Sequence, residues 1–367
     1  MERPRNQTSK RILVAPLDWG LGHATRCIPV IRELLDQQAD VVLAGEGPAQ
    51  NLLKAEFPQL EFVPLRGYDV RYSGHRWSLP FIIASQIPKI LSAIQYENER
   101  LKEIVKEQAI DGIISDNRYG MYDQELPSVI ITHQLLIRTG LGRTADEYLQ
   151  SFHYQQLAPF SACWVPDVEE GTGLAGELSH PRKLPSIPVA YTGPLSRMKK
   201  IEAEKSQHLL ILLSGPEPQR TILEEKILEQ LAEYKDPVIL LRGLPGGADI
   251  PATHAHVTVY NHMNAEDLHN AMAGASFVIG RCGYSTVMDL SFMGKKSILI
   301  PTPGQTEQEY LSDHLMKQNF AFCIDQEKFR LKAVLDLAND FKYNMVDYSG
   351  QSRLKEVVGD FLKMSAG

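Results

Sequence analysis

The chain reads Arg11-Ile-Leu-Val-Ala-Pro-Leu-Asp-Trp-Gly-Leu-Gly-His23 near its start, and this stretch decides the fold. Its apolar run predicts a buried β-strand. The glycines then predict a tight turn, because glycine adopts positive φ and lets the backbone approach a ligand closely. A histidine at the start of a helix lies beside the positive end of the helix dipole, which favours the neutral, proton-accepting imidazole. The stretch therefore predicts strand, turn and helix, with His23 as a candidate general base. An exposed histidine in an ordinary strand-to-helix turn is the alternative.

The composition indicates a soluble globular protein with two domains. Its 367 residues exceed the usual size of one hydrophobic core, and 43% of them are hydrophobic and 23% charged. A net charge of -7 argues against a nucleic-acid partner, because phosphate recognition needs clustered Lys and Arg. The four cysteines form no Cys-X-X-Cys pair, which argues against a zinc knuckle and a disulfide framework. We therefore expect a protein of the reducing cytoplasm.

The N-terminal segment carries no expected targeting or membrane signal. Residues 1–10 are polar and basic, without the apolar core of a signal peptide, and are expected to form a disordered tail. No apolar run reaches the roughly 18 residues that span a bilayer.

Strand-like and helix-like segments alternate along the rest of the chain, which predicts parallel sheets covered by helices. The rhythm breaks in the proline-rich residues 178–188 and restarts after Gly193. We therefore expect two doubly wound, Rossmann-like domains that face each other across a ligand cleft. Their expected bounds are 11–192 and 193–345, and a C-terminal helix at 346–367 is expected to cross back to the first domain. The expected strands are 12–15, 41–44, 61–64, 112–115, 129–132 and 162–166, then 209–213, 238–241, 256–260, 277–279 and 297–301.

The second domain contains a candidate phosphate site after its strand at 277–279. The turn that follows would leave backbone N–H groups and hydroxyls at a helix N-terminus, an arrangement suited to a phosphate. A carboxylate one turn later could accept ribose hydroxyls. A serine-capped helix after a tight turn is the alternative. The residues concerned are Gly280, Gly283, Ser285, Thr286 and Asp289.

Two further turns in the second domain are candidate ligand contacts. Gly215 and Arg220 lie in a proline-containing turn that could face the same phosphates, although its prolines make it stiffer than a usual phosphate cradle. Gln305, Glu307 and Gln308 start a helix and combine the donors and acceptors that a sugar requires. An acidic first helical turn that complements the helix dipole explains Glu307 equally well.

The acceptor side is less clearly marked. His133 and Gln134 leave a strand toward the predicted cleft, where His133 could contact substrate or serve as a hydrogen-bonded structural histidine. Arg76 and Trp77 belong to a basic, aromatic loop beside the apolar segment that ends at residue 94. Such a loop could hold an anionic lipid-linked acceptor or rest on a membrane surface. A surface loop leading into a core helix is an equal alternative.

Taken together, these motifs resemble the inverting GT-B glycosyltransferases, especially the MurG-like branch related to glycosyltransferase family 28. The resemblance covers nearly the whole chain and rests on the order and spacing of three stretches. Gly20-Leu-Gly22-His23-Ala-Thr-Arg26 resembles the family's glycine loop with its proposed catalytic histidine. Gly280-Arg-Cys-Gly-Tyr-Ser-Thr-Val-Met-Asp289 resembles the donor-site stretch, and Gln305-Thr-Glu-Gln308 resembles the segment that reads the donor sugar.

The resemblance implies an inverting transferase that moves a sugar from a nucleotide-sugar donor, UDP-linked above all, to an acceptor hydroxyl. His23 would be the base, and Asp116 is placed like the aspartate that orients this histidine in related enzymes; turning the chain with Asn117 is its alternative role. Arg26 is assigned to the acceptor side, and the nucleotide sugar is a co-substrate, so no cofactor is expected. No Asp-X-Asp motif ends a strand in the second domain, and no catalytic metal is expected.

The chain departs from the MurG-like pattern at two points. Pro29 lies six residues beyond His23, which predicts either a helix that begins at Pro29 or one that is kinked there. The peptidoglycan acceptor motifs are not recognisable, so the acceptor is not carried over. A lipid-linked acceptor and a peripheral position at the inner face of the plasma membrane remain expectations. A nucleotide-sugar hydrolase and a non-catalytic nucleotide-sugar-binding protein are the competing functions.

Overall fold

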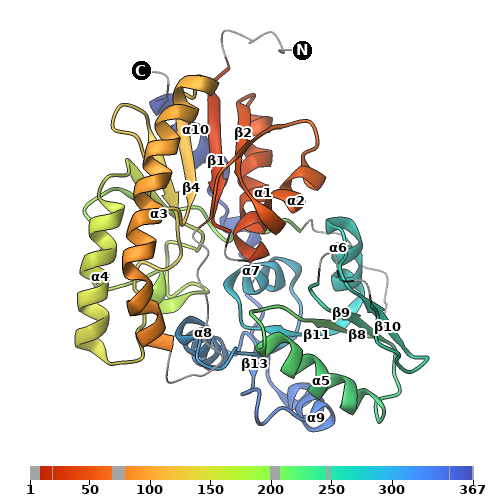
Figure 1. Cartoon of the computed structure of the whole chain (residues 1–367). Helices are drawn as coiled ribbons and strands as arrows, with labels where there is room; N and C mark the ends of the chain where they lie inside the picture. The colour runs from red at the N-terminus through yellow and green to blue at the C-terminus, as the bar shows by residue number, and fades with distance from the viewer. Residues whose placement is uncertain are drawn as a thin grey trace. The chain divides into compact units, whose positions relative to one another are not determined.

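The computed structural model describes residues 9–18, 20–67, 79–198, 207–244, 247, 249–346 and 348–365. The chain divides into two compact units (Figure 1). The first comprises Met1–Arg71, Ile83–Ser196 and Ser349–Gly367, and the second comprises Tyr72–Ile82 and Arg197–Tyr348.

The first unit is built on a parallel sheet of seven strands in the order β3-β2-β1-β4-β5-β6-β7. All neighbouring strands are parallel, and α-helices connect most consecutive strands, although none lies between β4 and β5. The strands are β1 (Arg11–Pro16), β2 (Asp40–Gly45), β3 (Glu61–Pro64), β4 (Gly112–Asp116), β5 (Ser128–Ile131), β6 (Ala162–Val165) and β7 (Val189–Tyr191).

The helices of the first unit include the last helix of the chain. That helix, α10, packs against α1, and the Phe361 ring meets the Trp164 ring edge-on, with centroids 5.7 Å apart. Gly112 leaves room for it, because an added Cβ there would lie 2.8 Å from the Phe361 ring. The helices are α1 (Leu21–Asp36), α2 (Gly47–Glu56), α3 (Leu79–Gln108), α4 (Arg143–Leu157) and α10 (Leu354–Met364), with 3-10 turns η1 (Gly176–Leu178) and η2 (Ser349–Gln351).

The second unit repeats the parallel architecture with six strands in the order β10-β9-β8-β11-β12-β13. Its strands are β8 (His208–Leu212), β9 (Val238–Leu241), β10 (Val257–Tyr260), β11 (Ala275–Arg281), β12 (Ser297–Ile300) and β13 (Phe322–Cys323). Its helices are α5 (Gln219–Leu231), α6 (Ala265–Gly274), α7 (Tyr284–Met293), α8 (Thr306–Lys317) and α9 (Leu331–Asp340).

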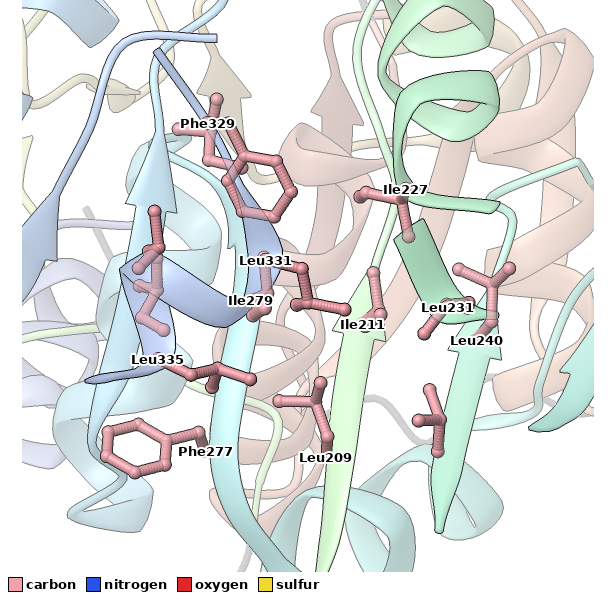
Figure 2. Close-up of a cluster of buried hydrophobic side chains, with 14 of the residues drawn as sticks. Leu209, Ile211, Ile227, Leu231, Leu240, Phe277, Ile279, Phe329, Leu331 and Leu335 are labelled. Atoms are coloured by element: carbon pink, nitrogen blue, oxygen red, sulfur yellow. The ribbon is translucent and has the colours of Figure 1, made fainter. Parts of the chain in front are cut away.

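The core of the second unit lies where α5 and α9 cover the sheet (Figure 2). Ile227 and Leu231 of α5, with Leu331 and Leu335 of α9, lie over strand residues that include Ile211. All are less than 10% exposed. Burial of each such side chain contributes about 1.5–3 kcal/mol to the free energy of folding. This packing holds in place the strands whose ends carry the candidate phosphate site.

The prediction of parallel α/β sheets is confirmed, and the predicted strands are all present with ends that differ by a few residues at most. Two strands were not predicted, β7 and β13. Both are short edge strands, β7 lies directly after the proline-rich loop, and three or two residues carry too little alternation to be recognised. Among the described residues, no helix combines the length and the apolar character that crossing a bilayer requires.

Candidate active site

Across the first sheet the strand numbers fall from β3 to β1 and then rise from β4 to β7. Across the second sheet they fall from β10 to β8 and then rise from β11 to β13, so each sheet has a switch point between its two middle strands. Ligands of open α/β sheets bind beyond the carboxyl ends of the strands at such a switch point. His23 follows β1, and Asp116 ends β4 in register with Pro16 of β1. The candidate base therefore lies at the switch point of its own sheet.

Helix α1 begins at Leu21, so His23 lies in its first turn. Gly20 precedes the helix with φ 79°, a left-handed conformation that favours glycine. Pro29 lies inside the helix, which continues to Asp36. The alternative that the helix begins at Pro29 is therefore wrong, and His23 lies at the N-terminal, positive end of the helix dipole.

His23 and Asp116 form a hydrogen-bonded pair, with 2.8 Å between Nδ1 and Oδ1. The Asp116 side chain is fully buried, whereas 16% of the His23 side chain remains exposed. His23 Nε2 makes no hydrogen bond to any described residue. When Nδ1 carries the proton and donates it to Asp116, Nε2 has the lone pair that a base uses.

Arg26 points to Asp116 and not to an exposed acceptor side. Its Nε and Nη2 donate to the two carboxylate oxygens, and its side chain is 3% exposed. The assignment of Arg26 to the acceptor side is therefore corrected, because the guanidinium is buried in an ion pair. Burial by itself would raise the pKa of Asp116, but Arg26 and His23 outweigh it and hold that pKa at about 2.

The charge balance around His23 favours its neutral form. Burial lowers the pKa of His23 below its ordinary value, and the Arg26 guanidinium lowers it further, against the opposing effect of Asp116. His133 also lies here and is 4% exposed, with its Nδ1 3.4 Å from Arg26 Nη1. The structure thus brings His23, Arg26, Asp116 and His133 together. Gln134 follows His133 and its backbone N–H donates to Thr132 Oγ1 at 3.2 Å.

In the second unit, β11 leads into α7 through Cys282 and Gly283. Gly280 lies inside β11, where an added Cβ would be 3.3 Å from the Leu212 carbonyl oxygen of β8, so this glycine permits close strand packing. Gly283 is the N-cap of α7, and Ser285 and Thr286 lie in the first turn. Asp289, 8% exposed, lies one turn further along the helix.

Neither a positive φ nor a close neighbour requires glycine at position 283, although glycine is also a favoured N-cap residue. Its φ of -82° suits any residue, and an added Cβ would meet no atom of the described residues within 4 Å. Glycine is otherwise kept where φ is positive or a neighbour is close. A bare backbone at a helix N-terminus suits the close approach of an anionic ligand.

Sequence reasoning missed a buried polar cluster at the ends of β11 and β12. Arg281 is 1% exposed and donates to the Pro301 carbonyl oxygen at 3.3 Å and to Gln326 Oε1 at 2.6 Å, with no carboxylate partner among the described residues. Burial lowers its pKa to about 10. Arg281 Nε and Thr302 Oγ1 are buried without a hydrogen-bond partner in the described part of the chain, and both lie within 4 Å of the position of an added Cβ on Gly215. In the sequence, the clue to this cluster is Arg281 itself, a charged residue at the end of a buried strand.

Arg220 does not serve as a free phosphate ligand. Its side chain is 6% exposed and pairs with Glu217 at 2.5 Å and Glu224 at 3.0 Å, and it also donates to Thr221 Oγ1 and the Arg242 carbonyl oxygen. The assignment of Arg220 to the donor site is therefore corrected, because its guanidinium is held by two carboxylates of its own unit, Glu217 before α5 and Glu224 within it.

The amide side chains at the start of α8 are partly engaged with each other and with the preceding loop. Gln308 Oε1 accepts from the backbone N–H of Thr302 at 2.9 Å, while its amide nitrogen donates to Gln305 Oε1. Gln308 is 9% exposed, so its amide braces the loop after β12. Gln305 is the N-cap and Glu307 lies in the first turn, both partly exposed.

Arg76 and Trp77 lie outside the described residues, as does most of the predicted tail. Within the residues that the structure covers, no three His, Cys, Asp or Glu side chains gather as a metal site would require. The expectation of a metal-free reaction stays a prediction.

Comparison with known proteins finds a family match for part of the second unit. Residues 219–357 match the glycosyltransferase family 28 C-terminal domain. A UDP-N-acetylglucosamine--N-acetylmuramyl-(pentapeptide) pyrophosphoryl-undecaprenol N-acetylglucosamine transferase of Francisella philomiragia is 28% identical over 29% of this chain and 27% of its own. An uncharacterised glycosyltransferase of Methanosarcina acetivorans is 24% identical over 82% of this chain and 79% of its own.

Solved structures agree with the fold of the whole chain. The glycosyltransferase VinC in complex with dTDP has a TM-score of 0.62 at 12% identity, covering 97% of this chain and 99% of its own. MurG of Acinetobacter baumannii has a TM-score of 0.55 at 16% identity, covering 96% and 99%. The chain therefore has the GT-B fold of these glycosyltransferases, and its residues 219–357 match the glycosyltransferase family 28 C-terminal domain.

Proposed function

We propose that this protein is an inverting glycosyltransferase that moves a sugar from a UDP-sugar donor to an acceptor hydroxyl, with His23 as general base. The observation that carries the proposal is the His23–Asp116 pair at the switch point of the first sheet, with 2.8 Å between Nδ1 and Oδ1 and with Nε2 unbonded among the described residues. A buried carboxylate that fixes the histidine tautomer leaves the other ring nitrogen to take a proton.

The proposed reaction is a single displacement at the anomeric carbon. The acceptor oxygen forms a bond to that carbon as its proton passes to His23 Nε2. The bond between the carbon and the diphosphate oxygen breaks, and its electron pair leaves with the diphosphate. Asp116 accepts the hydrogen bond from Nδ1–H and stabilises the imidazolium that forms.

The second unit is proposed to bind the donor. Amide groups and hydroxyls at the start of α7, including those of Ser285 and Thr286, would meet the diphosphate, and Asp289 would accept ribose hydroxyls. Arg281 adds a buried positive charge at the end of β11. These groups would stabilise the charge that develops on the leaving diphosphate.

A lipid-linked acceptor is proposed from the relatives. The Francisella protein is named as a transferase acting on a pyrophosphoryl-undecaprenol substrate. By analogy, we infer an acceptor attached to a lipid and a cytoplasmic protein in peripheral contact with the membrane. The expectation of a reaction independent of divalent cations belongs to the same proposal.

Thermal unfolding with a panel of nucleotides tests the donor assignment. A ligand that binds only the folded protein raises the unfolding temperature with concentration. UDP and UDP-sugars are expected to do so more strongly than ADP- or GDP-sugars. Absence of stabilisation by every nucleotide sugar in the panel would contradict a donor site.

Replacing Gly283 with alanine should separate donor binding from stability. The new methyl group has open space and an ordinary φ, but alanine is a poorer N-cap residue than glycine, so the free energy of unfolding should fall by no more than about 1 kcal/mol. The same methyl group would lie where the diphosphate approaches, so the Kd for UDP should rise about tenfold, equivalent to about 1.4 kcal/mol. Calorimetric titration with UDP and denaturant unfolding measure the two quantities.

Gly294→Ala is the matched control at the other end of α7. Gly294 caps the helix with φ 60°, so alanine there should cost about 1 kcal/mol of stability and leave the Kd for UDP unchanged. Unchanged UDP binding by Gly283→Ala would show that no ligand approaches this residue.

The pH dependence of kcat/KM should reflect the lowered pKa of His23. A general base must be unprotonated, so kcat/KM rises as pH passes upward through the pKa of the free enzyme's base. Because burial and Arg26 lower that pKa from 6.5, the half-maximal value should fall below pH 6.5, with a plateau at neutral pH. Initial rates at subsaturating donor, measured from about pH 4.5 to about pH 8, give the pH at which kcat/KM is half-maximal. A midpoint above 6.5 would contradict the assignment.

A further inference from the structure

Arg26 occupies a position between the two members of the proposed dyad and a second histidine. It lies one helical turn after His23 on α1, and its guanidinium contacts both oxygens of Asp116. Its Nη2 lies 2.7 Å from His23 Nδ1, and its Nη1 lies 3.4 Å from His133 Nδ1. With 3% of its surface exposed, it is placed to act on these groups and not on a solvent-borne ligand.

His23 Nδ1 therefore faces two groups that require opposite tautomers. If Nδ1 carries a proton, it donates to Asp116 at 2.8 Å and Nε2 is free to act as a base. If Nδ1 is bare, it accepts from Arg26, which never gives up its own protons, and Nε2 carries the hydrogen. Only the first arrangement can deprotonate an acceptor.

Asn117 contacts the same guanidinium and favours the first arrangement. In the orientation that satisfies both ends of its amide, its oxygen accepts from Arg26 Nη2 at 3.1 Å and its nitrogen donates to Thr132 Oγ1 at 2.9 Å. The two N–H groups of Arg26 Nη2 are then used by Asp116 and Asn117. His23 Nδ1 then donates its hydrogen to Asp116, and the Arg26 guanidinium acts on His23 only through its positive charge.

The charged and titratable groups around His23 come from three elements. Arg26 lies on α1, Asp116 ends β4, and His133 follows β5. The thiol of Cys27 donates to Asp116 Oδ2 at 3.6 Å. An Asp116 carboxylate alone would favour imidazolium, and the neighbouring guanidinium offsets that effect.

We propose that Arg26 is a positioning residue that offsets the Asp116 charge and so keeps His23 unprotonated at neutral pH, an inference that rests on the proposed role of His23 as base. Arg26 touches neither donor nor acceptor in this account. It orients Asp116 through both oxygens and opposes the positive charge that protonation of Nε2 would create. The dyad thereby keeps its orientation without becoming protonated before the acceptor binds.

The test follows His23 itself in the absence of substrate. The protonation of His23 is titrated by NMR of histidine-labelled protein, where the signal is assigned among the 11 histidines by its loss in His23→Gln. In Arg26→Met, Asp116 loses its neutralising partner, and the His23 titration midpoint is expected to rise by about one pH unit or more. In Asp116→Asn, Arg26 remains, and the midpoint is expected to fall. Opposite shifts from the two partners are a result that loss of structure alone would not produce.

Further variants keep the test decisive if Arg26→Met does not fold. Arg26→Gln can still donate a hydrogen bond to Asp116 but carries no charge, so it should also raise the midpoint. Arg26→Lys keeps the charge without the two-pronged geometry and should titrate close to the wild type. Arg32→Met, which removes a partly exposed arginine of the same helix, should leave the midpoint unchanged.

An unchanged or lowered midpoint in Arg26→Gln would overturn the proposal. Because the titration is read without turnover, this result is distinct from failure of the proposed function. A rise in the midpoint without detectable sugar transfer would support the role of Arg26 and count against the transferase. If the protein transfers sugar, the pH at which kcat/KM reaches half of its plateau should rise together with the His23 titration midpoint.

Discussion

Replacing His23 with alanine is expected to lower kcat for sugar transfer by about 10²- to 10⁴-fold, the range that a positioned general base contributes. The reason is that Nε2 is the ring nitrogen that Asp116 leaves open, and alanine offers no group to accept the acceptor proton. Donor binding should persist, because the proposed donor residues belong to the other unit. Steady-state rates and UDP titration of the same preparation separate the two effects.

The control for this variant is His254→Ala, which removes an exposed histidine before β10. It should transfer sugar at the wild-type rate. His23→Ala should also retain cooperative unfolding, because its side chain is not part of the hydrophobic core. Turnover within a few-fold of wild type in His23→Ala would remove His23 from the reaction.

The largest stability effect is expected at Glu97, which is fully buried with Arg118. Arg118 Nε donates to Glu97 Oε1 at 2.6 Å, and neither side chain is exposed. Glu97→Gln leaves the Arg118 charge without its partner, and breaking such a pair costs about 3–5 kcal/mol. The unfolding temperature of the first unit should fall by about 10 °C. Calorimetry of the whole chain measures this change.

The Glu97–Arg118 pair also supports the candidate site. Arg118 Nη1 donates to the Pro16 carbonyl oxygen at 3.2 Å, and Pro16 is in register with Asp116. Glu103→Gln, on the exposed face of the same helix α3, is the matched control and should cost less than about 1 kcal/mol. Equal stability of the two variants would contradict the structural role of the buried pair.

The strands and the first turn of α1 could be predicted because their signals are local. The apolar run of β1 and the glycines before His23 contain the information that forms them, and β1 and α1 occur where the sequence indicates. Pro29 left the start of α1 open between two positions, because proline inside a helix is usually unfavourable and its tolerance depends on packing. Eight residues of α1, Arg26 and Ile28 among them, are buried, and that packing offsets the lost hydrogen bond.

The partners of buried charges could not be predicted, because they depend on tertiary contacts. Nothing in the residues around Arg26 indicates that it reaches Asp116, 90 positions away in the sequence. Arg220 differs, since Glu224 lies four residues after it, the spacing of a pair on one helix face, and Glu217 lies three residues before it in the turn that precedes α5. That spacing is visible in the sequence and predicts the engaged guanidinium that the structure contains.

The acceptor dependence of diphosphate release tests the central proposal most directly. Purified protein is incubated with a panel of radiolabelled UDP-sugars, with and without a lipid extract, and both released UDP and labelled lipid are measured. We expect UDP to be released only when the extract is present, in an amount equal to the labelled sugar that the lipid gains. Release at the same rate without any acceptor, as in a hydrolase, or no release from any nucleotide sugar would contradict it.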